Sequence, residues 1–191
     1  MDADVLAAIA KWPDVPAVFG WLGLTARGEW RLKGQPIENA AIRAFVGRNY
    51  AGDAQGCWYF QNGPQRVYVA LEATPWVWRV DAQGSVSSHA GAAPKRIIGA
   101  ALLDDGRLLL QTELGAGLVD DRDAAWALRC VTDRAGTVLN EQGLNRWLDG
   151  RDEAFVAPRL LALQGEPLRI ERLAFAAIER RFRFVREPRA P

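Results

Sequence analysis

The sequence has little of the chemistry on which catalytic and metal sites most often depend. Its 191 residues include one histidine, His89, and two cysteines, Cys57 and Cys130. A Ser–His–Asp triad would have to use His89, and no GxSxG motif is present. The cysteines lie far apart in the chain without a CxxC partner, so buried thiols are a better expectation than a disulfide or a zinc site. We therefore predict no metal and no cofactor, and we assign no catalytic residue.

Long apolar runs and an excess of charge of one sign are also missing. No apolar run approaches the roughly 20 residues that a transmembrane helix needs. The first residues, MDADVLAAIAKWP, carry acids where a secretory signal carries basic residues. The formal net charge is +1, so no overall field attracts nucleic acid or anionic lipid. These features predict a cytoplasmic protein that binds neither nucleic acid nor membrane, and they leave the oligomeric state open.

Glycine-rich phosphate loops are absent as well. The chain contains no GxxxxGK[ST] motif and no GxGxxG motif after a strand. The segment ELGAGLVDDRD has Gly115 and Gly117 but no lysine after them, so a turn between strands explains it better. Its acids Asp120, Asp121 and Asp123 could bind a hard cation. A solvated acidic loop is the more frequent outcome for such a pattern.

What the sequence does contain is a mixture of helical and strand patterns. The segment QPIENAAIRAFVG predicts a helix that begins near Pro36 and ends at Gly47. QRVYVALE alternates as a strand does, and KRIIGAALLDDGRLLLQTEL predicts a hairpin that turns at Asp105-Gly106. Near the end, EPLRIERLAFAAIERRFRFV has apolar residues at helical spacing from Ile170 to Ile178, which predicts a terminal helix.

These patterns predict an α+β protein with two domains. The small, polar stretch Asp81–Pro94 is the best candidate for a boundary. We assign residues 1–85 to an N-terminal α+β domain of helices and antiparallel-type strands, and residues 86–191 to a mainly β domain with a terminal helix. LTARGEWRLKGQPIENAAIRAFV and CVTDRAGTVLNEQGLNRWL share the order strand, Arg-Gly turn, strand, helix. An internal duplication and chance recurrence of a common unit both remain open.

The aromatic stretch CWYFQNGPQRVYVALEATPWVWRV, residues 57–80, is the main candidate for a binding surface. Its aromatic side chains either pack a sheet or stack on a planar ligand, and packing is favoured because aromatics fill cores more often than they line sites. Trp58, Phe60, Val67, Val69 and Leu71 are assigned to the core. The candidate ligand-binding residues are Asn62, Gln65, Arg66, Tyr68, Glu72, Trp76 and Trp78, together with Arg48, Asn49 and Tyr50, which follow the predicted helix.

Several motifs in order carry a family resemblance. They are RGEWRLKGQPI, with Gly28, Trp30, Gly34, Pro36 and Ile37, and GCWYFQNGPQRVYVALEATPWV, with Gly56, Tyr59, Phe60, Pro64, Val69, Glu72, Pro75 and Val77. LLLQTELG and PLRIERLAFAAIERRFRFV follow farther on. Together they resemble an uncharacterised bacterial family, domain of unknown function 1285, most closely over residues 20–80. GLNRWLDGRDEAFVAPRLLAL departs from the family pattern, so membership of a sister family is the alternative.

The resemblance implies an α+β first half, a mainly β second half with a pleckstrin-homology-like roll, and an internal duplication. It also implies a ligand site between the halves, suited to a nucleotide-like molecule, and a signalling role. It brings no established catalytic residues. The function we predict is therefore the binding of a small ligand.

Two alternatives remain. One is a protein-interaction module that docks through the aromatic stretch or through the arginine-rich end at Arg180, Arg181, Arg183 and Arg186. The other is an enzyme that uses Glu72 and Arg66 for acid–base chemistry. The lack of a histidine network, a metal site and a nucleophile motif counts against an enzyme.

Overall fold

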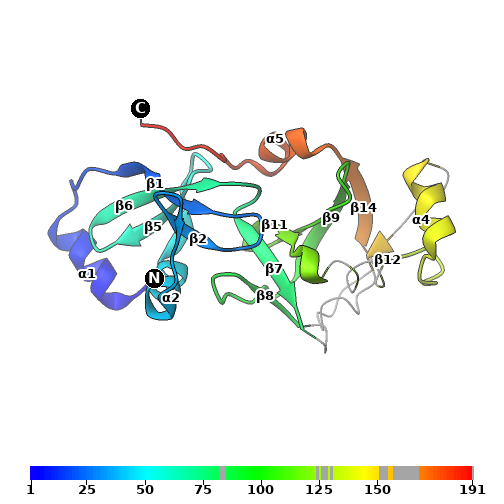
Figure 1. Ribbon diagram of the computed structural model, residues 1–191, viewed down its shortest axis with the longest axis horizontal. Coiled ribbons are helices and arrows are strands. Elements are labelled where there is room, and N and C mark those ends of the chain that lie inside the picture. Colours follow the sequence, from blue (N-terminus) through cyan, green and yellow to red (C-terminus); the bar gives the residue numbers. More distant parts are fainter. Residues whose placement is uncertain are drawn as a thin grey trace. The chain divides into compact units, whose positions relative to one another are not determined.

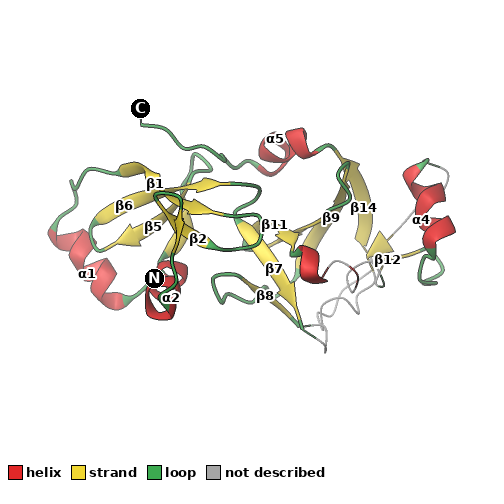
Figure 2. Ribbon diagram, viewed as in Figure 1, coloured by secondary structure: helices red, strands yellow, loops and turns green. Residues whose placement is uncertain are grey.

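The computed structural model describes residues 1–81, 85–123, 125, 129, 131–150, 155–156 and 168–190. Its chain forms two compact units, each assembled from more than one segment (Figure 1). Unit 1 comprises Met1–Pro75, Ser88–Ala92 and Glu179–Pro191, and unit 2 comprises Trp76–Ser87 and Ala93–Ile178. Helices and two mixed sheets occur together (Figure 2), so the predicted α+β class is confirmed. The predicted division at residues 85 and 86 stays a prediction.

Unit 1 is built on a six-stranded sheet in the order β3-β2-β1-β6-β5-β4. Strands β1 and β6 are parallel, and the other neighbours are antiparallel. Its elements are α1 (Ala3–Lys11), β1 (Val18–Leu24), β2 (Trp30–Leu32), β3 (Gln35–Pro36), α2 (Ala40–Arg48), β4 (Tyr50–Gly52), β5 (Trp58–Asn62) and β6 (Gln65–Leu71).

Strand β6 shows how the sequence orients this sheet. Val69 and Leu71 are buried, whereas Arg66, Ala70 and Glu72 are exposed. Side chains alternate between the two faces of a strand, so the predicted alternation of QRVYVALE is confirmed. One face of β6 therefore packs on the core, and the other forms an outer face of unit 1.

The core of unit 1 contains an aromatic cluster around the single histidine. The ring centroid of His89 lies 5.1 Å from that of Trp30 and 5.8 Å from that of Tyr50. Trp30 and Tyr50 meet edge to face at 5.1 Å. Burial lowers the pKa of His89 to about 3, so the imidazole is neutral at physiological pH. We therefore assign His89 to packing in unit 1.

Unit 2 is built on an eight-stranded sheet in the order β12-β13-β14-β9-β10-β11-β7-β8. Strand β11 is parallel to β7, and β14 is parallel to β9. Its elements are β7 (Trp76–Val80), β8 (Val86–Ser88), β9 (Ile97–Leu103), β10 (Leu108–Thr112), β11 (Gly115–Val119), η1 (Asp121–Asp123), β12 (Val131–Thr132), α4 (Glu141–Leu148), β13 (Phe155–Val156), β14 (Leu168–Leu173) and η3 (Phe175–Ala177). The chain then enters α5 (Ile178–Phe182), which from Glu179 onward belongs to unit 1. Strands β9 and β10 pair antiparallel around Asp105-Gly106, so the predicted hairpin is confirmed.

The predicted helix from Pro36 to Gly47 is shifted. Gln35–Pro36 forms β3, which pairs with β2, and the helix begins only after Asn39, whose side chain accepts hydrogen bonds from the backbone N–H groups of Ala41 and Ile42. Helix α2 ends at Arg48, so Gly47 lies inside it. A Cβ atom on Gly47 would be 3.0 Å from the backbone of Ala90, so close packing explains this glycine.

The predicted terminal helix is wrong over its first part. Leu168–Leu173 forms strand β14, and a regular helix begins only at Ile178. Ile170 and Leu173 fit a helical period, but β14 finds a parallel partner in β9, where Ile170 pairs with Ala100. The sheet satisfies the backbone groups along its length, and this tertiary pairing overrides the local pattern.

Two finer fold expectations stay predictions, namely the pleckstrin-homology-like roll and the internal duplication. Locally, the two similar segments do contain the same kind of helix start. Asn39 caps α2, and Asn140 caps α4 by accepting a hydrogen bond from the N–H of Gly143. Asparagine is among the residues most preferred at this position, so the match does not require a common origin.

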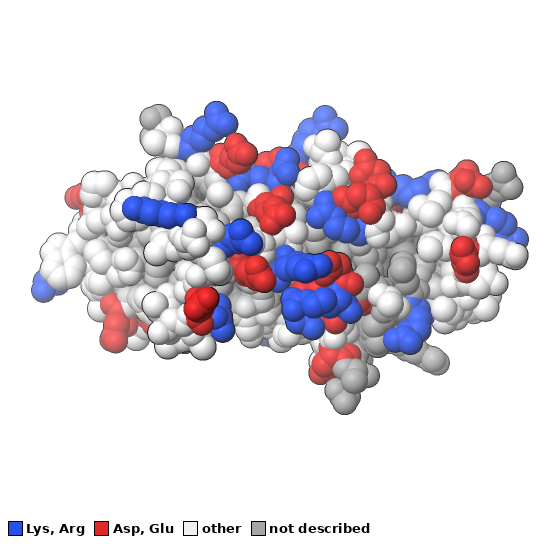
Figure 3. Space-filling view, in the orientation of Figure 1, with Lys and Arg blue, Asp and Glu red and all other residues white. Residues whose placement is uncertain are grey.

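Basic and acidic side chains are interspersed on the face shown in Figure 3, in keeping with the small net charge. No helix in the described ranges is long and apolar enough to cross a membrane. Cys57 carries a free thiol whose pKa is raised by burial, and Cys130 lies outside the described residues. The location in the cell, and the expected lack of nucleic-acid and membrane binding, stay predictions.

Candidate functional site

A groove of about 380 Å³ lies within unit 1, along β1 and the end of β6. We call it the Trp21 groove. Its lining residues come from β1, the turn after it, β2, the β2–β3 turn, the end of β6 and the C-terminal segment. They are Gly20, Trp21, Leu22, Gly23, Leu24, Thr25, Arg31, Gly34, Ala70, Leu71, Glu72 and Glu187.

Small residues form the floor of the groove. Gly23 of β1 is paired with Ala70 of β6, and a Cβ atom on Gly23 would meet only the Ala70 carbonyl oxygen, at 3.6 Å. A Cβ atom on Gly20 or Gly34 would meet nothing within 4 Å. Glycine inside a strand allows close approach to the backbone, and here it leaves the sheet open to a ligand.

Trp21 forms the aromatic wall. Its side chain is 50% exposed, unlike that of Trp30 on the neighbouring strand, which is 2% exposed. The Lys33 ammonium lies 4.1 Å from the centroid of the Trp21 ring, and the Lys33 N–H donates to the Trp21 carbonyl oxygen. Lys33 and Gly34 both have positive φ, at 48° and 82°, as the two central residues of a type I′ turn require. The β2–β3 turn therefore places a cation over an exposed indole.

Glu72 stands at the opposite side of the groove, just after β6. Its Oε2 atom accepts a hydrogen bond of 3.0 Å from the N–H of Ala26, and its own N–H donates to the carbonyl oxygen of Leu24. These two bonds fix the side chain against the turn that follows β1. Within the part of the chain that the structure describes, Oε1 has no hydrogen-bond partner. A ligand donor could therefore use Oε1 without breaking a bond inside the protein.

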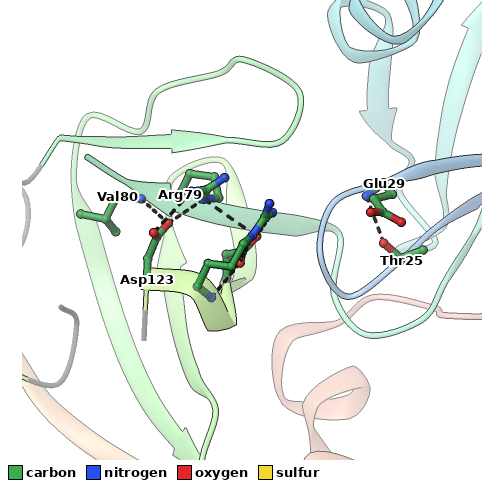
Figure 4. Close-up of polar contacts among 7 residues, drawn as sticks. Thr25, Glu29, Arg79, Val80 and Asp123 are labelled. Atoms are coloured by element: carbon green, nitrogen blue, oxygen red, sulfur yellow. Dashed lines mark hydrogen bonds and ion pairs between the residues drawn. The ribbon is translucent and has the colours of Figure 1, made fainter. Parts of the chain in front are cut away.

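The remaining charges of the groove are weakly paired. Arg31 lies 3.7 Å from Glu29, and both side chains are about half exposed, at 48% and 59%. The N–H of Glu29 donates to the Thr25 hydroxyl, which closes the β1–β2 turn (Figure 4). Exposed ion pairs of this kind contribute roughly 0–1 kcal/mol. Both charges therefore remain accessible to a ligand.

The C-terminal segment brings Glu187 to the groove. The N–H of Val185 donates to the Gly56 carbonyl oxygen at 2.9 Å, and the N–H of Leu71 donates to the Arg186 carbonyl oxygen at 2.8 Å. Arg186 also donates to the Glu179 carboxylate through its backbone N–H and its Nε atom, both at 2.8 Å. These contacts tie the segment to the sheet of unit 1 and fix the position of the wall that it forms.

Of the ten predicted ligand-binding residues, only Glu72 lines this groove. Arg48 and Asn49 instead hold the start of α1. The Asn49 side chain is fully buried, accepts from the N–H of Asp2 and donates to the Asp2 carboxylate, which Arg48 also contacts at 3.2 Å. The Tyr50 hydroxyl donates to the Pro75 carbonyl oxygen at 3.0 Å, and burial raises the pKa of Tyr50. All three side chains have a structural role.

Trp76 and Trp78 belong to unit 2 and are buried there, at 6% and 0% exposure. Their rings stack with centroids 5.7 Å apart. The Trp76 indole N–H donates to the Leu114 carbonyl oxygen, and that of Trp78 to the Leu110 carbonyl oxygen. Both therefore serve the core of unit 2. The site between the halves that the resemblance implies stays a prediction.

The other four predicted residues lie toward the β5–β6 turn. Asn62 is exposed and pairs with Gln65, whose side chain donates to the Pro16 carbonyl oxygen. Arg66 lies 4.7 Å over the Tyr59 ring, and the Tyr68 hydroxyl donates to the Asp53 carboxylate at 3.1 Å. Whether these residues bind a ligand stays a prediction.

The enzyme hypothesis needs Glu72 and Arg66 to act together. Arg66 and Glu72 are six residues apart along β6 and its end, which corresponds to roughly 20 Å in an extended strand. A small substrate could not contact both side chains at once. The pair therefore offers no acid–base site in this geometry.

The sequence interpretation missed Trp21, Gly23 and Arg31. The signal that could have found them is the segment FGWLGL, in which a tryptophan stands between two glycines of one strand. Glycine weakens a strand and often marks a place where something approaches the backbone. An aromatic residue beside such a position deserved the same weight as the longer aromatic stretch.

The acids after β11 are not arranged around a cation. The fully buried Asp120 is 2.5 Å from the Arg122 guanidinium, and Asp123 accepts from Arg79 at 2.6 Å and from the N–H of Val80 at 3.0 Å (Figure 4). Burial alone would raise the pKa of Asp120, but the bonds from Arg122 outweigh it and lower the pKa. Among the described residues, no cluster of His, Cys, Asp and Glu could hold a metal ion. We assign Asp120 and Asp123 to the folding of unit 2.

Comparisons with known proteins place the chain in a family without a known activity. A family model described as "Protein of unknown function (DUF2946)" matches residues 1–189. No curated protein matches the chain. A solved DUF1285 family protein from Silicibacter pomeroyi DSS-3 is 14% identical, with a TM-score of 0.52, and the match covers 76% of this chain and 100% of that chain. Another, from Shewanella baltica OS155, is 19% identical, with a TM-score of 0.42 and coverages of 54% and 86%. The resemblance to domain of unknown function 1285 is thereby confirmed, and the likeness extends to the fold alone.

Proposed function

The chain belongs to the family described as "Protein of unknown function (DUF2946)", and we propose that it binds a small molecule in the Trp21 groove. The observation that carries this proposal is the half-exposed Trp21 beside a floor of glycine and alanine. Burying an indole in the core stabilises the folded protein, as it does for Trp30 in the same sheet. Trp21 has no such burial. An exposed aromatic wall over open backbone instead favours a ligand that completes the packing.

The size and polarity of the groove narrow the kind of ligand. Its volume of about 380 Å³ is near the lower end of the range for small-molecule sites, roughly 300–1,000 Å³. Trp21 offers a stacking surface, and the Oε1 atom of Glu72 offers an acceptor for an N–H or O–H donor. These groups support a flat or compact molecule that carries a donor.

The nucleotide-like ligand that the resemblance implies belongs to the same proposal. A nucleobase could stack on Trp21 and donate to Glu72, whereas its phosphates would have to avoid the carboxylates of Glu72 and Glu187. The signalling role that the resemblance implies would follow from the binding of such a ligand. The predicted site between the halves is tested by the same ligands.

A thermal-shift panel of nucleosides, nucleotides and small aromatic and ammonium compounds tests the proposal. We expect at least one class to raise the melting temperature of the natural protein and to lose this effect with Trp21→Ala. Trp12→Ala is the matched control, because Trp12 is 51% exposed and also carries a lysine over its ring, yet lies outside the groove. A panel without stabilising compounds, or equal losses in both variants, would contradict binding at Trp21.

The two alternatives have less support. Trp76 and Trp78 are buried and offer no docking surface, although Arg180, Arg181 and Arg183 are exposed. The enzyme hypothesis loses its pair, because Arg66 does not line the groove with Glu72. We therefore place small-molecule binding first.

A further inference from the structure

We propose that residues 185–187, here called the strap, open and close one wall of the Trp21 groove while the rest of unit 1 stays folded. The opening of the strap does not depend on a ligand, whereas its effect on binding rests on the proposed function. Three features of unit 1 support the proposal. They are the few bonds that hold the strap, the single ion pair that fastens it, and its place beside the groove.

The strap lies in the sheet of unit 1 as a short extra strand. Val185 forms a parallel bridge with Cys57, and its N–H donates to the Gly56 carbonyl oxygen at 2.9 Å. On its other side, the strap accepts a hydrogen bond of 2.8 Å from the N–H of Leu71 to the carbonyl oxygen of Arg186. Among the described residues, these two backbone hydrogen bonds join the strap to the sheet.

Firm burial of the C-terminal segment ends just before the strap. The Phe184 side chain is 5% exposed and belongs to the core of unit 1. Val185 and Arg186 are half-buried, and Glu187 is exposed. Segments with few buried apolar contacts open locally at a free energy well below that of global unfolding. The strap can therefore leave the sheet while Phe184 remains in the core.

One ion pair, here called the latch, holds the strap to α5. The backbone N–H of Arg186 donates to Oε1 of Glu179, and its Nε atom donates to Oε2, both at 2.8 Å. Burial raises the pKa of Glu179, but these bonds outweigh it and lower the pKa, so the carboxylate is ionised at neutral pH. The two side chains are 30% and 33% exposed, so water partly screens the pair. The latch thus holds the strap with a bond of moderate strength.

The groove differs between the closed and the open strap. Both Leu71 and Glu187 line it. In the closed state the Leu71 N–H is bonded to the strap, and the groove has the carboxylates of Glu72 and Glu187. Opening removes Glu187 from the wall and frees the Leu71 N–H as a donor. A molecule that contacts the closed wall binds this state more tightly and shifts the equilibrium toward it.

Two neighbouring amides report the opening directly. The Leu71 N–H donates to the strap, whereas the Glu72 N–H donates to the Leu24 carbonyl oxygen in β1. Amide hydrogen exchange of the full, ¹⁵N-labelled chain gives a protection factor for each. We expect the protection of Leu71 and Val185 to be about tenfold or more below that of Glu72. Equal protection of Leu71 and Glu72 would show that the strap leaves only when the sheet unfolds, and would overturn the proposal.

A matched pair of substitutions tests the latch. Arg186→Gln removes the guanidinium bond to Glu179, so the protection of Leu71 should fall about fivefold while that of Glu72 is unchanged. Arg189→Gln breaks the pair with Glu187, in which the two side chains are 83% and 77% exposed, and should change the protection of Leu71 less than about twofold. Equal effects of the two variants, or an equal fall at Leu71 and Glu72, would contradict the latch.

The link between strap and groove is tested with compounds from the thermal-shift panel, namely adenosine, adenosine monophosphate and tyramine. A compound that raises the melting temperature should, at saturation, raise the protection of Leu71 about fivefold relative to that of Glu72. An unchanged ratio with a bound compound would show that the strap does not control the groove. If no compound of the panel is stabilising, the proposed function fails, and the exchange of Leu71 and Glu72 still decides whether the strap opens.

Discussion

In unit 2, Gly117 of β11 lies against the two tryptophans of β7. A Cβ atom on Gly117 would contact the Trp78 indole nitrogen and would be 2.7 Å from the Cβ atom of Trp76. In unit 1, Gly20 and Gly23 stand on either side of Trp21, and the nearest atom that a Cβ would meet there is 3.6 Å away. Tryptophan and glycine are neighbours in both units, but the space above glycine is filled in one and open in the other.

The difference shows what a glycine beside a tryptophan can mean. In unit 2 the missing side chain is replaced by an indole of the same protein, and the result is a close-packed core. In unit 1 no described atom fills the space that a side chain at Gly20 would occupy, and the indole of Trp21 is half exposed. Residue type alone does not decide between a core and a binding groove; the elements that cover each face of the strand decide it.

Filling the space over Gly117 should give the largest effect. Gly117→Ala forces a methyl group against Trp76 and Trp78, which are held by hydrogen bonds to Leu114 and Leu110. We expect a loss of about 3 kcal/mol in the free energy of unfolding, as for other overpacked cores. Urea denaturation measures it. In unit 1, the Cβ atom of Gly23→Ala would make an ordinary contact at 3.6 Å. If this variant is equally destabilising, the space above glycine does not differ between the two units.

Acidification should destabilise unit 1 through His89, the single histidine of the chain. The pKa of His89 is about 3 in the folded state and about 6.5 in the unfolded state, so the unfolded state binds the proton first as the pH falls. The stability that His89 contributes is complete above pH 6.5 and is lost progressively toward pH 3. By linkage, about 2 kcal/mol should be lost between pH 7 and pH 5.

Urea denaturation at pH 7 and pH 5 of the natural protein and of His89→Gln isolates this contribution. The variant should be less stable at pH 7, because glutamine packs less well against Trp30 and Tyr50, but it should lose less stability on acidification. An identical pH dependence in the two proteins would show that His89 does not titrate with a lowered pKa.

Removing a buried charge in unit 2 should lower the free energy of unfolding more than breaking an exposed ion pair in unit 1. Asp120 is fully buried and accepts from Arg122 through the backbone N–H at 2.9 Å and the Nε atom at 2.8 Å. Asp120→Asn removes the charge-assisted bonds, and we expect a loss of about 1.5 kcal/mol in the free energy of unfolding. Arg48→Gln, which breaks the exposed pair with Asp2, should cost less than about 0.5 kcal/mol. Equal losses in the free energy of unfolding would show that burial does not determine how much each ion pair contributes to stability.

Local pattern predicted much of the fold because it records which face of an element is apolar. The alternation along β6 and the turn at Asp105-Gly106 are both visible in the letters, and both are confirmed. The same reasoning fails at Leu168–Leu173, where Ile170 and Leu173 fit a helix and only the parallel neighbour β9 makes them a strand. Parallel pairing joins distant segments, so no short window contains it.

The candidate site was harder to predict for the same reason. Glu72 was identified because it ends an alternating strand on its polar face, and the structure places it in the groove. Trp76 and Trp78 were chosen for their aromatic character, but β7 is covered on both faces, since Trp76, Val77 and Trp78 are all buried. Trp21 was missed because its exposure follows from the absence of a covering element in unit 1. Exposure is a property of the tertiary structure, and the letters around a tryptophan do not show it.

The smallest expected effect on stability belongs to the change that should matter most for binding. Gly23→Val adds a branched side chain beside Ala70 on the outer face of unit 1, where valine is at least as favourable in a strand as glycine. We expect the free energy of unfolding to change by less than about 0.5 kcal/mol, while the melting-temperature response to the stabilising compounds of the ligand panel is lost. Ser87→Val, an exposed strand position in unit 2, adds the same side chain outside the groove and should leave the response intact. If Gly23→Val responds to those compounds as the natural protein does, the open floor of unit 1 is not where the ligand lies. If instead Gly23→Val is destabilised as much as Gly117→Ala, the space above Gly23 is closed in solution, and the two units use glycine in the same way.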